Sequence, residues 1–180
     1  MKKTLLLLCC VFFLQNIYAQ TPMTVKKFES QPNAAVAVAG DLNEGAVMTD
    51  LSWAWNSSNA CFPETQVKKY KGNHVLYFTQ IPKYSVMVIK LIPTDENANF
   101  SLYAYSTNKS KPSIVPQLPS CVSCEADHVW DRQWKGKTQD HTRSVELRAV
   151  NNPYGVIIGV VGGEGQTEGA YTIEVSLKTR

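Results

Sequence analysis

The sequence predicts an all-β protein: a single antiparallel β-sandwich interrupted by one long loop that contains proline, cysteine and tryptophan. Three observations lead to this fold class. Apolar and polar residues alternate with period two in many short segments, as expected for half-buried strands. Turn residues separate these segments at regular spacing, and no amphipathic helix longer than a few turns is evident.

The N-terminal segment predicts export. Lys2 and Lys3 precede the apolar run 5–14, which is too short to span a bilayer, and Ala19 ends a cleavage site before Gln20. We therefore expect a signal peptide over 1–19, of the kind found on exported proteins of gram-negative bacteria. The mature protein is expected in the periplasm or outside the cell. No later apolar stretch is long enough to predict membrane insertion of the mature form.

The predicted mature chain, 20–180, forms one domain with little net charge. Loss of Lys2 and Lys3 lowers the formal charge from +3 to +1. Positive charges occur at most as short pairs such as Lys68-Lys69. This pattern does not indicate a nucleic-acid partner or an acidic membrane surface.

Eight segments are predicted strands. In the segment RSVELRAV, for example, Val145, Leu147 and Ala149 share one face, while polar side chains occupy the other. Two of the eight, 84–92 and 154–162, are more continuously apolar, as expected for central strands. The full set is 34–40, 46–55, 74–80, 84–92, 99–106, 143–150, 154–162 and 170–178.

The segment from Thr107 to Thr142 interrupts the strand pattern. Three prolines punctuate it, and a connection of this length is usually functional or contains a small element of its own. A short helix is expected over Asp127–Lys135, which places Trp130 and Trp134 on a common face.

The strand segments resemble the bacterial pre-peptidase C-terminal (PPC) domain over about residues 70–178. The similarity lies in a Leu-Tyr-x-Tyr segment and in a closing hairpin of alternating apolar residues with a glycine-rich turn. The resemblance implies a jelly-roll-like sandwich that serves as an accessory module of secreted enzymes, standing alone here. Where the family has an aspartate-rich segment, this chain has Asn97-Ala98-Asn99-Phe100. The matching residues are Leu102, Tyr103, Tyr105, Tyr154, Val156, Ile158, Val160, Gly169, Tyr171, Thr172 and Val175.

Three cysteines remain after signal cleavage: Cys61, Cys121 and Cys124. In an oxidising compartment, neighbouring thiols form disulfides by default. We therefore predict a disulfide from Cys61 to Cys121 or to Cys124, or a local Cys121–Cys124 bridge. A c-type haem is excluded because Glu125, and not histidine, follows the C-x-x-C pair.

The alternative interpretation of the same cluster is a zinc or copper site. Thiolate and imidazole ligands suit both metals. The leading disulfide interpretation predicts no cofactor. The candidate ligands are Cys121, Cys124, His128 and His141, with Cys61 as a substitute for the last.

Two of the four tryptophans are candidate ligand-binding residues. Trp53 and Trp55 fall in a predicted strand and are expected in the core. Trp130 and Trp134 lie among charged residues, so they are expected at the surface, where an aromatic face can stack on a ligand. His74, at the start of a strand, is expected to be structural.

No catalytic motif is recognisable, so we predict that the protein is not an enzyme. The segments TDENANF and GGEGQTEG are expected to be turns, the second within a hairpin. The leading hypothesis is a secreted, non-catalytic binding, adhesion or accessory module for an extracellular polysaccharide or a partner protein. The alternative hypothesis is a periplasmic metal-binding protein that uses the Cys/His loop.

Overall fold

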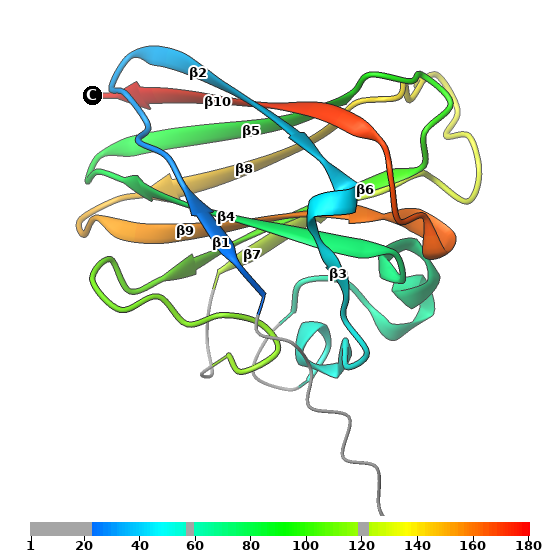
Figure 1. Cartoon of the computed structure of the whole chain (residues 1–180). Helices are drawn as coiled ribbons and strands as arrows, with labels where there is room; N and C mark the ends of the chain where they lie inside the picture. Colours follow the sequence, from blue (N-terminus) through cyan, green and yellow to red (C-terminus); the bar gives the residue numbers. More distant parts are fainter. Residues whose placement is uncertain (1–22, 57–59, 119–122) are drawn as a thin grey trace, which may run out of the picture.

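The computed structural model describes residues 23–56, 60–118 and 123–180. The predicted signal peptide and Cys121 lie outside these described residues. Within them, ten strands form two sheets that pack face to face, which confirms the predicted β-sandwich (Figure 1). Among the same residues, no helix has the length and apolar character needed to cross a membrane.

The first sheet has the strand order β1-β4-β9-β6-β7, and β3 pairs with β4 beside this path. Its pairs are antiparallel except for β1 and β4, which run parallel with Val25 opposite Leu76. This parallel pair is the exception within the predicted antiparallel sandwich. The strands are β1 (Val25–Lys27), β3 (Ala46–Val47), β4 (Asn73–Ile81), β6 (Phe100–Thr107), β7 (Cys124–Asp127) and β9 (Tyr154–Gly162).

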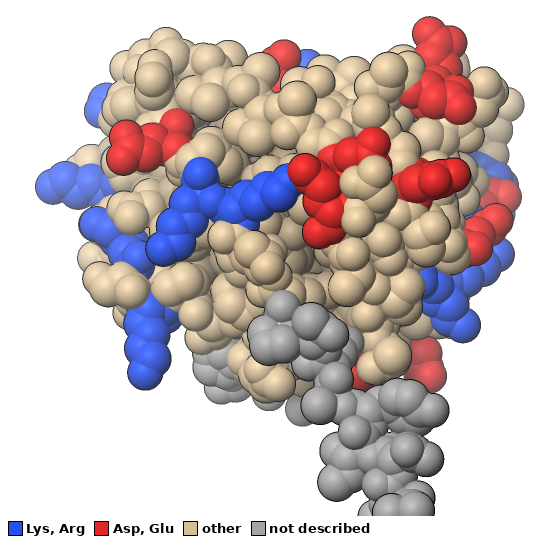
Figure 2. Space-filling view, in the orientation of Figure 1, with Lys and Arg blue, Asp and Glu red and all other residues tan. Residues whose placement is uncertain are grey.

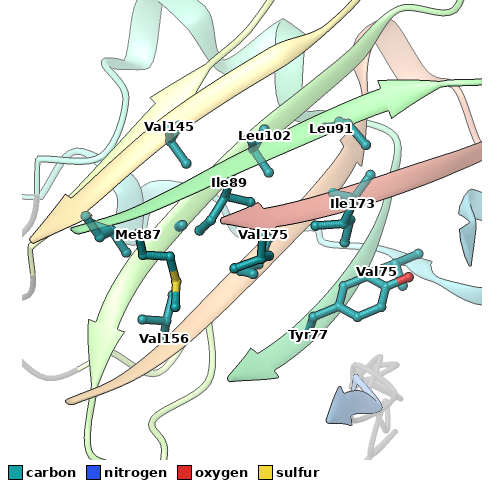
Figure 3. Close-up of a cluster of buried hydrophobic side chains, with 14 of the residues drawn as sticks. Val75, Tyr77, Met87, Ile89, Leu91, Leu102, Val145, Val156, Ile173 and Val175 are labelled. Carbon is teal, nitrogen blue, oxygen red and sulfur yellow. The ribbon is translucent and has the colours of Figure 1, made fainter. Parts of the chain in front are cut away.

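The second sheet is fully antiparallel and has the order β2-β10-β5-β8. Its inward side chains and those of the first sheet form the main core (Figure 3). Alternation places Val145, Leu147 and Ala149 inward, as predicted. The outer face of this sheet is open to solvent. The strands are β2 (Ala34–Asp41), β5 (Ser85–Pro93), β8 (Arg143–Ala149) and β10 (Ala170–Thr179).

A cap of irregular chain covers the outer face of the first sheet and creates a second core. The cap contains the 3₁₀ helices η2 (Ser52–Ala54) and η3 (Glu64–Tyr70) and the segment 108–118. Phe62 stacks on Tyr70 with ring centroids 3.7 Å apart, and Trp53 packs on Tyr103 at 5.3 Å. Since each aromatic ring buries a large apolar area, this layer contributes substantially to stability.

The cap explains two departures from the predicted pattern. The segment 46–55 is a strand only at Ala46–Val47 and then turns into η2, so Trp53 is a core residue without being in a strand. Strand β6 was expected to be half-buried, but it is buried on both faces from Phe100 to Tyr105. Its outer tyrosines pack beneath the cap instead of facing water.

The glycine-rich segment after β9 does not form a hairpin. Strands β9 and β10 belong to different sheets, so the chain crosses between layers through η4 (Gly163–Gly165). Glu164 and Gly165 both have positive φ there, at 53° and 90°. The other predicted turn is confirmed: the Asp95 carboxylate accepts a hydrogen bond from the Asn97 amide at 2.9 Å.

His74 is a neutral, structural histidine under the cap. Its side chain is 1% exposed, and burial lowers its pKa to about 4. Nε2 donates to the Tyr70 carbonyl at 3.0 Å, so Nδ1 is left to accept from the Tyr103 hydroxyl at 3.3 Å. Both hydrogen bonds suit the uncharged ring, as predicted for a structural role.

This burial predicts a loss of stability in acid. The unfolded chain takes up a proton on His74 near pH 6.5, whereas the folded chain resists protonation until about pH 4. Stability is therefore complete above the unfolded pKa and falls as the pH drops towards the folded one. When the pH is lowered from about 7 to about 4.5, the burial of His74 should reduce the free energy of unfolding by about 2 to 3 kcal/mol.

Urea unfolding of the wild type and of His74→Gln at both pH values measures this contribution. The variant should lose less stability on acidification, and His141→Gln, which changes a partly exposed ring, should behave like the wild type. An equal acid sensitivity of all three proteins would contradict the assignment.

Candidate functional site

The candidate site is the loop 128–142 between β7 and β8, called here the aromatic loop. The predicted helix over 127–135 is wrong, because Asp127 ends β7 opposite Leu102 and the following residues have no regular structure. The Gln139 side chain supplies bonds that a helix would otherwise make. Its Oε1 accepts from the Trp130 amide at 2.8 Å, and its Nε2 donates to the His128 carbonyl at 2.9 Å.

The two ends of the aromatic loop are tied together. The Asp127 carboxylate accepts from the Ser144 amide at 2.8 Å. Arg143, only 2% exposed, donates to the Asp140 carbonyl at 2.9 Å and to the Phe100 carbonyl of β6 at 3.0 Å. A loop whose ends meet and whose side chains close on each other is a compact Ω-type loop, a class that is frequently functional.

A disulfide fixes β7, the strand that leads into the aromatic loop. Cys61 of the cap bonds to Cys124, with 4.9 Å between Cα atoms and 63 residues between the two positions. Of the three predicted pairings, this structure has Cys61–Cys124. In this bond the Cys124 sulfur is not a thiolate, which is the form in which cysteine binds a metal ion.

Asp131 attaches the aromatic loop to η3. Its carboxylate accepts from Gln66 Nε2 at 2.9 Å and pairs with Lys69 Nζ at 3.0 Å, with Lys68 further away at 3.9 Å. The Gln66 hydrogen bond and then the Lys69 ammonium lower the pKa of Asp131, so it stays ionised. The Lys69 side chain is only 6% exposed, and this carboxylate neutralises it.

The predicted histidines do not converge on a common point in this structure. His128 is partly buried, its Nδ1 lies 3.0 Å from the Tyr70 hydroxyl, and burial lowers its pKa. His141 is partly exposed near the far end of the aromatic loop. Across the described ranges, no three His, Cys, Asp or Glu side chains are arranged to hold a metal ion.

Trp130 and Trp134 do come together. Their rings meet edge to face, with centroids 6.2 Å apart. Trp134 is 54% exposed, and the Arg132 guanidinium lies 5.8 Å from its ring centroid. The remaining basic residues of the loop, Lys135 and Lys137, are also exposed. The loop therefore offers an aromatic surface beside positive charge.

The contacts beneath this surface could not be read from the sequence. Gln66, Lys69 and Tyr70 lie about 60 residues before the aromatic loop in the chain, and no motif connects them to it. In the sequence, the adjacent pair Lys68-Lys69 indicated only positive charge at the surface. Their role depends on the cap, which brings η3 against β7.

A cleft of about 840 Å³ lies at the other end of the sandwich. Phe28, Ile81 and Pro153 contribute apolar walls, and Lys27, Lys83 and Lys109 surround them. Figure 2 shows Lys and Arg side chains gathered on this side of the molecule, on the left of the view. The three exposed lysines outnumber the one carboxylate of the lining, Glu29, so the cleft has a net positive rim. The aromatic loop differs in combining charge with exposed rings.

Comparisons with known proteins identify no family. No protein-family model matches the chain, and no curated protein matches it in sequence. Three solved structures are similar in fold, each at 11% sequence identity.

The first structure is the pre-peptidase C-terminal domain of a collagenase from Bacillus anthracis, with a TM-score of 0.39, covering 88% of this chain and 99% of that one. The second is a periplasmic inhibitor of g-type lysozyme from Aeromonas hydrophila, with a TM-score of 0.41 and coverage of 85% and 96%. The third is a surface-associated copper-binding protein of Methylomicrobium album BG8, with a TM-score of 0.45 and coverage of 88% and 98%.

Proposed function

We propose that this protein is an exported, non-catalytic binding module whose aromatic loop captures an acidic extracellular polysaccharide. The observation that carries the proposal is the exposed Trp134 ring, held against Trp130 and bordered by Arg132. Apolar surface exposed to water is unfavourable, and two tryptophan rings in contact on a fixed loop form the kind of exposed patch that a ligand covers.

The arrangement suits a sugar polymer that carries carboxylates. The C–H face of a pyranose ring can pack on Trp134, which removes apolar surface of both from water. The same loop carries three basic side chains that can pair with carboxylates along the polymer: Arg132, Lys135 and Lys137. An arginine can bind a carboxylate in bidentate fashion, through two parallel hydrogen bonds. Export fits a ligand outside the cytoplasm.

The bracing of the loop supports binding without rearrangement. The aromatic loop is fixed in place before a ligand binds, by the disulfide and by the side-chain contacts of Asp131, Gln139 and Arg143. Ordering a loop on binding costs about 0.5 to 1.5 kcal/mol for each immobilised side chain. A preformed aromatic surface avoids much of that cost, as is common in binding sites placed on rigid frameworks.

Trp134→Ala should weaken polysaccharide binding at least about tenfold, because an exposed aromatic anchor is the kind of residue that dominates binding energy. Affinity electrophoresis and calorimetry with polygalacturonate and alginate, and with neutral cellulose and xylan for comparison, measure this loss. Binding to the acidic polymers should also weaken as salt rises, since charge pairs contribute.

Tyr84→Ala is the matched control. Tyr84 is 50% exposed and lies in the β4–β5 turn, at the other end of the sandwich from the aromatic loop (Figure 1). This variant should bind like the wild type. The proposal fails if no acidic polymer binds, or if Tyr84→Ala and Trp134→Ala lose affinity equally.

A further inference from the structure

Strand β2 differs from the other sheet edges of the described chain. It lies at the free edge of the second sheet and pairs on one side only, with β10 (Figure 1). Its sequence, AAVAVAGD, contains no lysine, no proline and no charge before Asp41. A long, uncharged edge strand presents unpaired backbone groups that favour the addition of another strand.

The remaining edges carry the protections that prevent such pairing. Strand β1 has three residues, two of them lysines, and β3 has two residues. Strand β7 has four residues, including Glu125 and Asp127. Strand β8 directs Glu146 and Arg148 outward and lies alongside β7. Edge protection is therefore general in this fold and missing at β2.

The alternation of hydrogen bonds along β2 shows which of its backbone N–H and C=O groups are not bonded to β10. The Leu42 amide donates to the Gly169 carbonyl at 3.1 Å, continuing the register in which Gly40 lies opposite Tyr171. Because pairing alternates along an antiparallel ladder, Val36 and Val38 direct their backbone groups to β10. The N–H and C=O groups of Ala35, Ala37 and Ala39 therefore point away from the sheet.

We infer that β2 is a homodimerisation edge, which pairs antiparallel with β2 of a second copy around a two-fold axis through Ala37. The sequence supports a second copy as the partner, because it reads nearly the same in both directions from Ala37. In this register, Ala35 lies opposite Ala39 and Val36 lies opposite Val38 of the other copy.

This register has no steric or electrostatic obstacle along the strand. The side chains of Ala35, Ala37 and Ala39 are exposed on the open outer face and are too small to clash. Asp41 is the ionisable residue of the strand, and it falls opposite the uncharged turn that precedes β2 in the other copy. The two four-stranded sheets would join into one continuous sheet.

Charge substitutions at Ala37 test the inference with little effect on the fold, since this side chain is exposed. Ala37→Glu places two like charges opposite each other across the axis and beside Glu174 of each copy, so its dimer should dissociate at least about tenfold more readily than the wild type. Ala37→Lys also places like charges across the axis, but each lysine lies opposite Glu174 of its own copy, so its dimer should weaken less than that of Ala37→Glu. An equal mixture of the two variants places opposite charges together and should restore the dimer. Sedimentation velocity over a range of protein concentrations measures all three.

Thr172→Lys is the control, because it adds the same charge to the open face of β10, one strand in from the free edge and off the two-fold axis. It should dimerise like the wild type. A wild-type protein that stays monomeric up to about 1 mM overturns the inference, since specific strand addition should be detectable at such concentrations. It is also overturned if Thr172→Lys, and not Ala37→Lys, disrupts the dimer.

Discussion

Replacing both Cys61 and Cys124 by alanine is expected to lower the free energy of unfolding by about 4 kcal/mol. The Cys61–Cys124 bond spans 63 residues, and closing a loop of this length restricts the unfolded chain by about that amount in the loop-entropy model. The bond also joins the cap to β7, so its loss releases both sides of the second core. Urea unfolding of the oxidised proteins, monitored by tryptophan fluorescence, measures the change.

Cys121→Ala is the matched control for this prediction. It removes the third cysteine of the predicted mature chain and leaves the Cys61–Cys124 bond intact. Its stability should stay within about 0.5 kcal/mol of the wild type. The assignment is contradicted if Cys121→Ala is the variant that loses stability, because Cys61 would then pair with Cys121, the other predicted long-range partner.

Gly159→Ala is expected to cost about 3 kcal/mol, although it adds one methyl group. Gly159 lies in the central strand β9, opposite Tyr103 of β6. A Cβ at this position would lie 2.1 Å from the Cζ atom of Tyr103, which is far inside van der Waals contact. The Tyr103 ring is fully buried, with Trp53 5.3 Å away and its hydroxyl on His74, so it has no free direction to move.

A double-mutant cycle separates this clash from the general effect of changing a glycine. In a Tyr103→Leu background the ring is absent, and Gly159→Ala should then cost less than about 1 kcal/mol. Thermal or urea unfolding of the four proteins gives the coupling energy. If Gly159→Ala costs the same in both backgrounds, the contact with Tyr103 is not the cause.

Local patterns in the sequence determined the main sandwich. Period-two alternation correctly placed Val145, Leu147 and Ala149 in the core, because side chains of a strand alternate between faces regardless of what lies beyond. Continuous apolar character correctly marked 154–162 as a central strand. Compartment chemistry favoured a disulfide at Cys61, and the turn at Asp95 followed from side-chain bonding to its own backbone.

Contacts between distant segments decided the rest. Alternation says which residues share a face but not what covers that face, so the second core around Tyr103 and Tyr105 became visible only with the cap in place. Which cysteine pairs with Cys61 depended on where β7 meets the cap. The aromatic loop was recognisable from its tryptophans, whereas its attachment through Lys69 required η3 and Asp131 to meet in space. The sequence by itself therefore determined the strands and the candidate surface, and the tertiary structure decided what holds that surface in place, because those contacts join residues with no periodic or local relation.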